Sequence, residues 1–166
     1  MSLSKKMISE LNAQITAENE SAYVYKAMAY KLESMNLSVF AKWFHLQADE
    51  ERAHAEKFGK YLLDQGAEVK LAALAAPKAG WKSCKEICAE TFKHEQMITK
   101  RINKLVDLAR AEKDHATDSF LMWFVNEQVE EEASAAELLA MVELAGTASQ
   151  VFMLEGRVWR MIESRG

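Results

Sequence analysis

Glycine, proline and cysteine are scarce in this sequence of 166 residues, which contains 6 Gly, 1 Pro and 2 Cys. Average usage in a chain of this length would give roughly 12 Gly and 8 Pro. Because turns depend on glycine and proline, their scarcity excludes a sandwich or barrel of many short strands. The apolar fraction of 49% is enough to form a core. We therefore expect one all-α domain over residues 1–166, made of a few long helices.

Three further absences narrow the functional classes. No apolar run approaches the roughly 18 residues of a membrane span, and residues 1–10 lack the apolar core of a secretory signal. The net charge of −4 gives no basic surface for nucleic acid. Cys84 and Cys88 lie one helical turn apart, which fits neither a disulfide framework nor a zinc finger, so we interpret them as core residues in a reducing cytosol. We expect a cytoplasmic protein that binds neither nucleic acid nor membrane.

Helical periodicity divides the chain into four long segments and a short one: about 4–34, 38–65, 83–113, 117–145 and 147–164. Ser4, Ser38 and Ser83 are candidate N-caps, and Thr147 begins a candidate capping box. The single proline, Pro77, lies between the second and third segments. The chain therefore predicts five helices separated by few breakers.

The lengths of the links predict how these helices pack. The first two and the last two long helices are joined by a few residues, so each pair forms an antiparallel hairpin. The link over 66–82 must pass a helix of about 27 residues, or roughly 40 Å, and an extended link reaches about 50 Å. We predict a four-helix bundle over about 4–145 with one long crossover, followed by a C-terminal helix over about 147–164.

The core-facing positions of each long helix are apolar near its ends and carry polar side chains of ligand type in the middle. These residues are Glu18, Glu51, His54, Glu95, Gln128 and Glu131. Buried carboxylates cost several kcal/mol each and repel one another, and no Lys or Arg shares these positions. Bound cations would offset this cost, and oxygen ligands with one imidazole suit iron or manganese and also accept zinc.

A less specific interpretation exists for each of these residues taken alone. A single Glu at a core-facing position is more often a misjudged helix phase, and His54 alone would be a hydrogen-bonded core histidine. Gln47, Tyr25 and Tyr61 fit packing residues with satisfied polar tips. The coincidence of four helices interrupted at the same depth favours a metal centre.

A numerical regularity supports the metal centre. Four pairs of residues are separated by the same 77 positions: Glu18 and Glu95, Glu50 and Glu127, Glu51 and Gln128, His54 and Glu131. The ligand pattern of the first hairpin thus recurs in the second, as two hairpins clasping two metal ions require. The stretch Glu51-Arg-Ala-His54 is the Glu-x-x-His element of dinuclear carboxylate bundles.

With these motifs the sequence resembles the ferritin family, and most closely the bacterial non-haem ferritins. The resemblance covers essentially the whole chain and is carried by Glu18, Glu50-Glu51-Arg-Ala-His54, Lys93-His-Glu95-Gln96 and Asn126-Glu127-Gln128-Val129-Glu130-Glu131. It implies a ferritin-like four-helix bundle with a short fifth helix. It also implies a homo-oligomeric shell of 24 subunits that oxidises Fe²⁺ to Fe³⁺ with O₂ or H₂O₂ and stores ferric mineral inside.

The resemblance also implies roles for individual residues. Glu18, Glu51 and His54 match the ligands of the first iron. Glu51 bridges to a second iron held by Glu95 and Glu131, with Gln128 close by, and we expect this iron to be the more exchangeable one. Tyr25 matches a tyrosine that donates electrons, a role for which Trp123 is a weaker candidate. Glu50, Glu127 and Glu130 match a third iron site, although a solvated acidic face explains them nearly as well.

Departures from related families exclude some cofactors. Bacterioferritins have a second Glu-x-x-His in the fourth helix, where this chain has Glu127 and Glu130 at that spacing. They also carry a haem-binding Met directly after the Glu of the second-helix motif, where this chain has Arg52, so no haem is expected.

Two other functional classes stay open. A diiron oxygenase or reductase would be a monomer or dimer with substrate-dependent turnover, and 166 residues leave little room for its substrate pocket. A binding bundle such as a miniferritin that coats DNA would need a basic tail. We expect Tyr23, Tyr30, Ile87, Phe92 and the apolar residues of the fifth helix at subunit contacts, unless some of them face the core.

Overall fold

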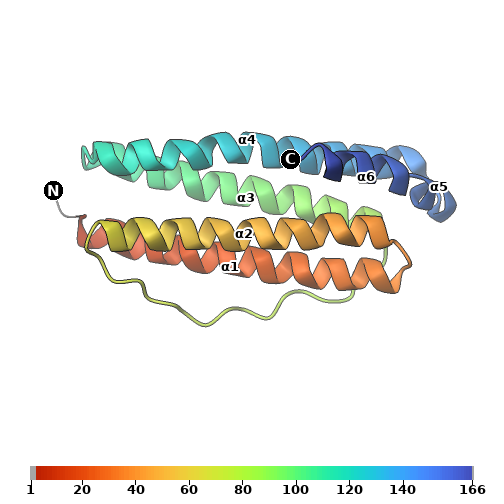
Figure 1. Ribbon diagram of the computed structural model, residues 1–166, viewed down its shortest axis with the longest axis horizontal. Coiled ribbons are helices and arrows are strands. Elements are labelled where there is room, and N and C mark those ends of the chain that lie inside the picture. The colour runs from red at the N-terminus through yellow and green to blue at the C-terminus, as the bar shows by residue number, and fades with distance from the viewer. Residues whose placement is uncertain (1–2, 166) are drawn as a thin grey trace.

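The structure, a computed structural model, describes residues 3–165, so residues 1, 2 and 166 of the predicted domain lie outside the described part. This part is all-α and contains no strand, which confirms the predicted fold class (Figure 1). Its helices are α1 (Lys5–Ser34), α2 (Ser38–Asp64), α3 (Cys84–Ala111), α4 (His115–Ala145), α5 (Ala148–Met153) and α6 (Glu155–Glu163).

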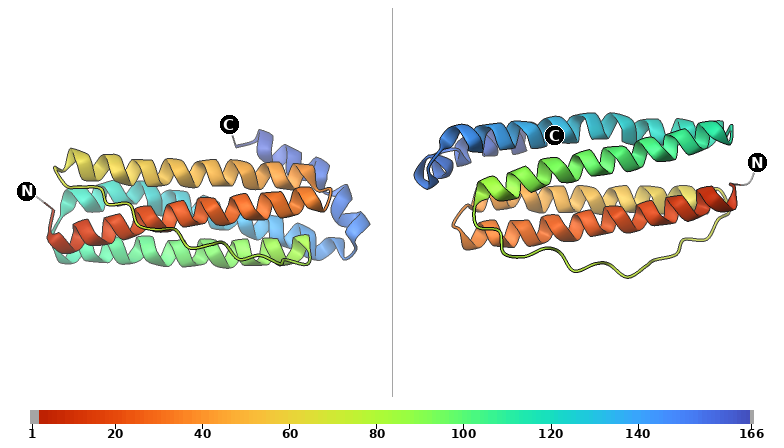
Figure 2. Two further views of the ribbon diagram at one scale, coloured as in Figure 1. Left: turned by 90° about the horizontal axis from the view of Figure 1, so that it is seen from below. Right: turned by 180° about the vertical axis from the view of Figure 1, so that it is seen from behind.

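The four long helices form the predicted bundle of two antiparallel hairpins, α1 with α2 and α3 with α4 (Figure 1). Residues 65–83 run along the outside of the bundle from one end to the other (Figure 2). Asn12 of α1 holds this crossover, because its amide donates to the Glu68 carbonyl (3.1 Å) and accepts from the Lys70 backbone N–H (2.6 Å). The long crossover returns the chain to the end where the first hairpin turns.

Three of the four predicted N-caps make the expected side-chain hydrogen bonds. Ser4 accepts a hydrogen bond from the Met7 N–H, and Ser83 accepts one from the Glu86 N–H. Thr147 and Gln150 form a complete capping box. These bonds satisfy backbone donors that a helix leaves unpaired at its first turn.

Two helix starts differ from the prediction. Ser38 is the first residue of α2 and not its N-cap, a position taken by Leu37 without a side-chain hydrogen bond. The fourth long helix begins at His115, two residues before the predicted start, because the carboxylate of Asp114 caps it by accepting from the Thr117 N–H (3.1 Å). Asp is as good an N-cap as Thr or Ser, so the two starts were close in propensity.

The predicted C-terminal helical segment is present and has a break at Leu154, which separates α5 from α6. Helix α6 folds back along the bundle (Figure 1). It packs on α2. Val158 of α6 is buried there, and the Phe40 backbone N–H of α2 donates to the Glu155 carboxylate (2.9 Å). The segment is thus anchored to its own bundle.

Two apolar clusters fill the bundle and leave a polar layer between them. One lies toward the α5 end and includes Tyr25, Phe44 and Leu138, and the other includes Leu11, Phe58 and Phe124. Cys84 and Cys88 are buried free thiols in the first cluster, with Sγ atoms 4.0 Å apart, as the core interpretation predicts.

The apolar residues considered for subunit contacts divide into two sets. Ile87 is fully buried in the core and Phe92 is half-buried, whereas Tyr23 and Tyr30 are 50% and 59% exposed. Of these four residues, the two tyrosines are therefore the most available to a neighbouring subunit, and Phe152 of α5 is 60% exposed as well. Within residues 3–165, no helix is long and apolar enough to cross a membrane.

Candidate metal centre

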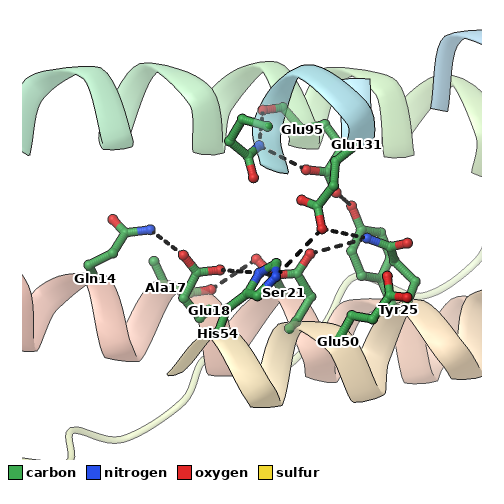
Figure 3. Close-up of polar contacts among 12 residues, drawn as sticks. Gln14, Ala17, Glu18, Ser21, Tyr25, Glu50, His54, Glu95 and Glu131 are labelled. Carbon is green, nitrogen blue, oxygen red and sulfur yellow. Dashed lines mark hydrogen bonds and ion pairs between the residues drawn. The ribbon is translucent and has the colours of Figure 1, made fainter. Parts of the chain in front are cut away.

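The six polar residues predicted at one depth do lie together in the layer between the two apolar clusters, and Figure 3 labels four of them, Glu18, His54, Glu95 and Glu131. They are Glu18 on α1, Glu51 and His54 on α2, Glu95 on α3, and Gln128 and Glu131 on α4. Residues three or four apart share one face of a helix, which is why Glu51 and His54 point the same way. Five of the six are buried, and the Glu131 side chain is only 9% exposed.

Two groups of side chains are close enough to hold a metal ion each. Glu18, Glu51 and His54 form the first group, and Glu51, Glu95 and Glu131 form the second. Within each group one ligand atom from every residue lies within 4.8 Å of the others. Glu51 belongs to both groups, so its carboxylate stands where a bridge between two ions would be needed.

Several oxygens of this cluster are buried without a hydrogen-bond partner. They are Glu18 Oε2, Glu51 Oε2 and Glu131 Oε2. His54 Nδ1 lies 3.3 Å from Glu51 Oε2 and 4.0 Å from Glu18 Oε2. Unpaired buried oxygens are costly, and divalent cations with a preference for oxygen and imidazole ligands would satisfy them. The donor set therefore fits a pair of such ions.

Burial shifts the ionisation of these carboxyl groups. It raises the pKa of Glu18, and together with the negative charges of neighbouring carboxylates it raises the pKa of Glu51 and Glu131 well above the usual range. Desolvation and like charges both disfavour the ionised form. Without a cation, these groups therefore tend to keep their protons.

Tyr25 and Gln128 both bond to Glu95. The Tyr25 hydroxyl donates to Glu95 Oε1, and the Gln128 amide donates to Glu95 Oε2 (3.2 Å). Burial and the neighbouring carboxylates raise the pKa of the Tyr25 phenol well above its usual value, so it stays protonated. Glu95 is thus held at both oxygens, unlike the other three carboxylates.

Trp123, the second aromatic candidate, lies at the edge of the centre. Its ring packs edge-on against His54, with ring centroids 5.5 Å apart, and the Lys57 ammonium lies 3.7 Å from its centroid. The Trp123 side chain is 38% exposed. It therefore contacts a ligand of the first group and also reaches solvent.

The three residues predicted for a third site are not brought together as a ligand group. Glu50 and Glu130 are exposed and Glu127 is half-exposed, and none of them belongs to the two groups above. Glu50 instead lies 3.5 Å from the guanidinium of Arg165.

Sequence analysis missed several residues that contact the centre. Gln14 donates to Glu18, and Arg101 and Arg165 donate to Gln14 and Gln47. His94 shares a hydrogen bond of 2.7 Å with Ser21 and packs edge-on against Tyr25. The spacing of four positions between Gln14 and Glu18 is a signal that could have found the first contact.

A four-helix bundle with carboxylates and a Glu-x-x-His element facing inward defines the class of dinuclear carboxylate proteins. The model of the ferritin-like domain matches residues 8–145, and the chain belongs to the ferritin family. It is 37% identical over 151 residues to a bacterial non-heme ferritin of Bacteroides fragilis, covering 91% of this chain and 95% of that protein. It is 42% identical over 131 residues to a bacterial non-heme ferritin of Staphylococcus aureus, covering 79% of each.

Solved structures show the same likeness. An open pore ferritin from the hyperthermophilic archaeon Archaeoglobus fulgidus superposes with a TM-score of 0.92 and 40% sequence identity. The match covers 95% of this chain and 98% of that one. The similarity therefore includes most of the region beyond the four long helices.

Proposed function

We propose that this protein stores iron and that the dinuclear centre of each chain oxidises Fe²⁺ before the iron is deposited. The observation that carries the proposal is the Glu51 carboxylate, which belongs to both ligand groups and has an unpaired buried oxygen. Membership of the ferritin family supports the same function. Iron is thus the substrate of the centre and the cargo of the assembly.

The proposed reaction takes one electron from each of two ferrous ions. With O₂, two Fe²⁺ and two protons give two Fe³⁺ and one H₂O₂, and with H₂O₂ they give two Fe³⁺ and two water molecules. Carboxylates are hard anions that stabilise Fe³⁺ more than Fe²⁺, so a site rich in them favours the oxidised product. The raised carboxyl pKa values mean that Fe²⁺ binding displaces protons from the centre.

Different residues of the centre have different roles in this reaction. Glu18, Glu51 and His54 bind the first iron, and Glu51, Glu95 and Glu131 bind the second, with Gln128 beside it. We propose Tyr25 as a donor of one further electron to the O₂ or H₂O₂ that oxidises the iron, because its hydroxyl is bonded to Glu95, which can accept the phenol proton as the electron leaves.

The exit of ferric iron is assigned to the acidic residues beside the centre. Glu50, Glu127 and Glu130 lie on α2 and α4 next to the ligands and are partly or fully exposed. We propose that they bind a third iron transiently, on its way to the storage cavity. Their exposure supports a transfer site more than a permanent one.

The storage cavity requires an assembly, for which we propose the shell of 24 subunits. Exposed apolar side chains support such contacts: Tyr23, Tyr30, Leu71 and Phe152 are all at least half exposed in the single chain. Size-exclusion chromatography with light scattering tests this proposal. A shell elutes at several hundred kilodaltons, whereas a monomer or dimer with substrate-dependent turnover would identify an oxygenase or reductase.

Stopped-flow absorbance during Fe²⁺ addition in air tests the oxidation step. We expect Glu51→Ala and His54→Ala proteins to oxidise iron far more slowly than the unmodified protein. Glu56→Gln is the matched control, because Glu56 is exposed on the same helix and belongs to neither ligand group. Unchanged rates in both ligand variants would refute the assignment of the centre.

A further inference from the structure

Two glutamines stand in equivalent places beside the metal centre. Gln14 precedes Glu18 by four positions on α1, and Gln47 precedes Glu51 by four positions on α2. Both side chains are almost completely buried, with 1% and 2% exposure. Each lies one helical turn from a carboxylate that the metal centre uses, and points toward it.

Each glutamine joins an arginine to ligand carboxylates. The Gln14 amide donates to Glu18 Oε1 (2.7 Å), while its carbonyl accepts from Arg101 Nε (3.0 Å). Arg101 also donates to the Ala13 carbonyl (3.2 Å), which fixes the guanidinium against α1. Figure 3 shows Gln14 directed at Glu18.

The second connection has the same order of groups. The Gln47 amide donates to Glu51 Oε1 (3.4 Å) and to Glu131 Oε1 (3.3 Å), and its carbonyl accepts from Arg165 Nη2 (2.8 Å). The Arg165 guanidinium also packs over the Trp43 ring, 4.4 Å from its centroid. Arg165 follows α6, so the C-terminal segment contributes to this connection.

The chemistry of the amide explains why an arginine matters here. A glutamine side chain has a donor end and an acceptor end that differ little in shape, whereas a guanidinium can only donate. An arginine on one side therefore holds the carbonyl toward itself and turns the NH₂ group toward the carboxylate. The flipped amide would place its carbonyl oxygen against a carboxylate oxygen, and the two acceptors would repel each other.

The unpaired oxygens follow the same pattern. The three carboxylates that receive an N–H from Gln14 or Gln47 receive it at Oε1, and these are the same three whose Oε2 is buried without a partner. One oxygen of each group is thus held and the other is left for a ligand bond. Hydrogen bonds of this outer kind orient metal ligands and commonly change metal affinity 10- to 100-fold.

We propose that Arg101 and Arg165 are positioning residues of the metal centre, which act through Gln14 and Gln47 by fixing the orientation of the two amides. Arg101 serves the ion held by Glu18, Glu51 and His54. Arg165 serves mainly the ion held by Glu51, Glu95 and Glu131. The proposal rests on the proposed dinuclear centre, but it concerns metal affinity and geometry rather than oxidation.

Anaerobic calorimetric titration with Fe²⁺ tests the proposal on the whole purified protein. Arg101→Met is expected to lower the affinity for the first ion by about 10-fold, as for other outer hydrogen-bond partners. Arg165→Met is expected to lower the affinity for the second ion by a similar factor. The matched controls are Arg110→Met and Arg157→Met, which remove exposed arginines that pair with Asp118 and Glu137. Both controls should bind iron as the unmodified protein does.

A double-mutant comparison separates action through glutamine from a general effect of charge. If each arginine acts through its glutamine, Arg101→Met adds nothing to Gln14→Met, and Arg165→Met adds nothing to Gln47→Met. A purely electrostatic role predicts that the losses add. Arg101→Lys and Arg165→Lys keep a donor and a charge and should recover part of the affinity.

The absorption spectrum of bound Co²⁺ supplies a readout that loss of stability would not change. A reoriented carboxylate changes the coordination and hence the visible bands, so each Met variant should alter the spectrum of one ion. Unchanged affinities and spectra, or additive losses in the double variants, overturn the proposal while the dinuclear centre stands. Failure of the unmodified protein to bind two ions per chain would instead refute the proposed function itself.

Discussion

The two ligand groups of the centre differ in where their residues come from. Glu18, Glu51 and His54 all belong to the α1–α2 hairpin, whereas Glu95 and Glu131 come from α3 and α4. The first group can therefore be arranged by one hairpin, but the second exists only when both hairpins dock. The first also has an imidazole, while the second consists of carboxylates alone. The comparison teaches that one of the two proposed ion sites is largely local, whereas the other depends on the tertiary fold.

Removal of individual ligands should have the largest effect on the binding of the two ions. Glu51→Ala removes the shared carboxylate and should lower the affinity for both ions by at least about 100-fold. Even residues that only hydrogen-bond to a metal ligand change the affinity 10- to 100-fold. His54→Ala should abolish one ion and Glu131→Ala the other. Stoichiometries from anaerobic calorimetry with Fe²⁺ measure these losses. Two ions bound to the Glu51→Ala protein would show that the groups do not share a bridge.

The pH dependence of the metal-free protein should follow from its raised carboxyl pKa values. Burial raises the pKa of Glu18, Glu51 and Glu131 above the value of 4.5 expected for an exposed side chain. The folded protein thus holds protons that the unfolded chain releases, so the contribution of these three groups to stability is most favourable below pH 4.5 and declines as pH rises through the raised values. Thermal unfolding against pH measures this decline, and Glu51→Gln should flatten it.

Metal binding should reverse that dependence. Iron requires ionised ligands, so binding releases protons, and the apparent affinity should rise with pH by up to about tenfold per pH unit for each proton released. Titrations in buffers of different ionisation enthalpy count these protons. A proton count of zero would contradict the raised carboxyl pKa values.

A smaller effect is expected from adding a carboxylate to the second group. Gln128→Glu places a further anionic oxygen beside Glu95 and should strengthen the second ion by about 10-fold, the equivalent of about 1.4 kcal/mol. It should leave the first ion nearly unchanged. Competition with a chelator measures the affinities, and Gln96→Glu on the exposed face of α3 is the control. Equal strengthening of both ions would argue against two separable sites.

The smallest effect should come from Tyr25→Phe. This change removes the hydroxyl that donates to Glu95 Oε1. The affinity for the second ion should fall about fivefold, as expected for the loss of one hydrogen bond of about 1 kcal/mol. Tyr23→Phe is the control, because Tyr23 is on the same helix and half exposed. A lower affinity for the first ion alone would contradict the assignment of Tyr25 to the second ligand group.

Much of the fold was predictable because long helices carry strong periodic patterns. Ser4 and Ser83 were recognised as caps from local residues alone. Ser38 was predicted as a cap for the same reason, but this prediction was wrong, because Leu37 is the N-cap of α2 and makes no side-chain hydrogen bond there. Which of two neighbouring residues becomes the N-cap depends on how the helix packs, and the local sequence does not specify that packing.

The site shows the same division. The i, i+3 spacing of Glu51 and His54, and the repeat of 77 positions, placed the ligands at one depth without any knowledge of the fold. The pairing of Arg101 with Gln14 joins residues 87 positions apart, and that of Arg165 with Gln47 joins residues 118 apart. No periodicity relates such residues, so sequence patterns could not have predicted these contacts.

The sequence alone determined that acidic side chains would be buried in the middle of a helical bundle, because helical spacing places them on the same faces as the apolar residues. Only the tertiary structure decided which oxygen of each carboxylate is held and which is free. That choice depends on the amides of Gln14 and Gln47, which accept from Arg101 of α3 and Arg165 after α6 only once the two hairpins and α6 have packed together.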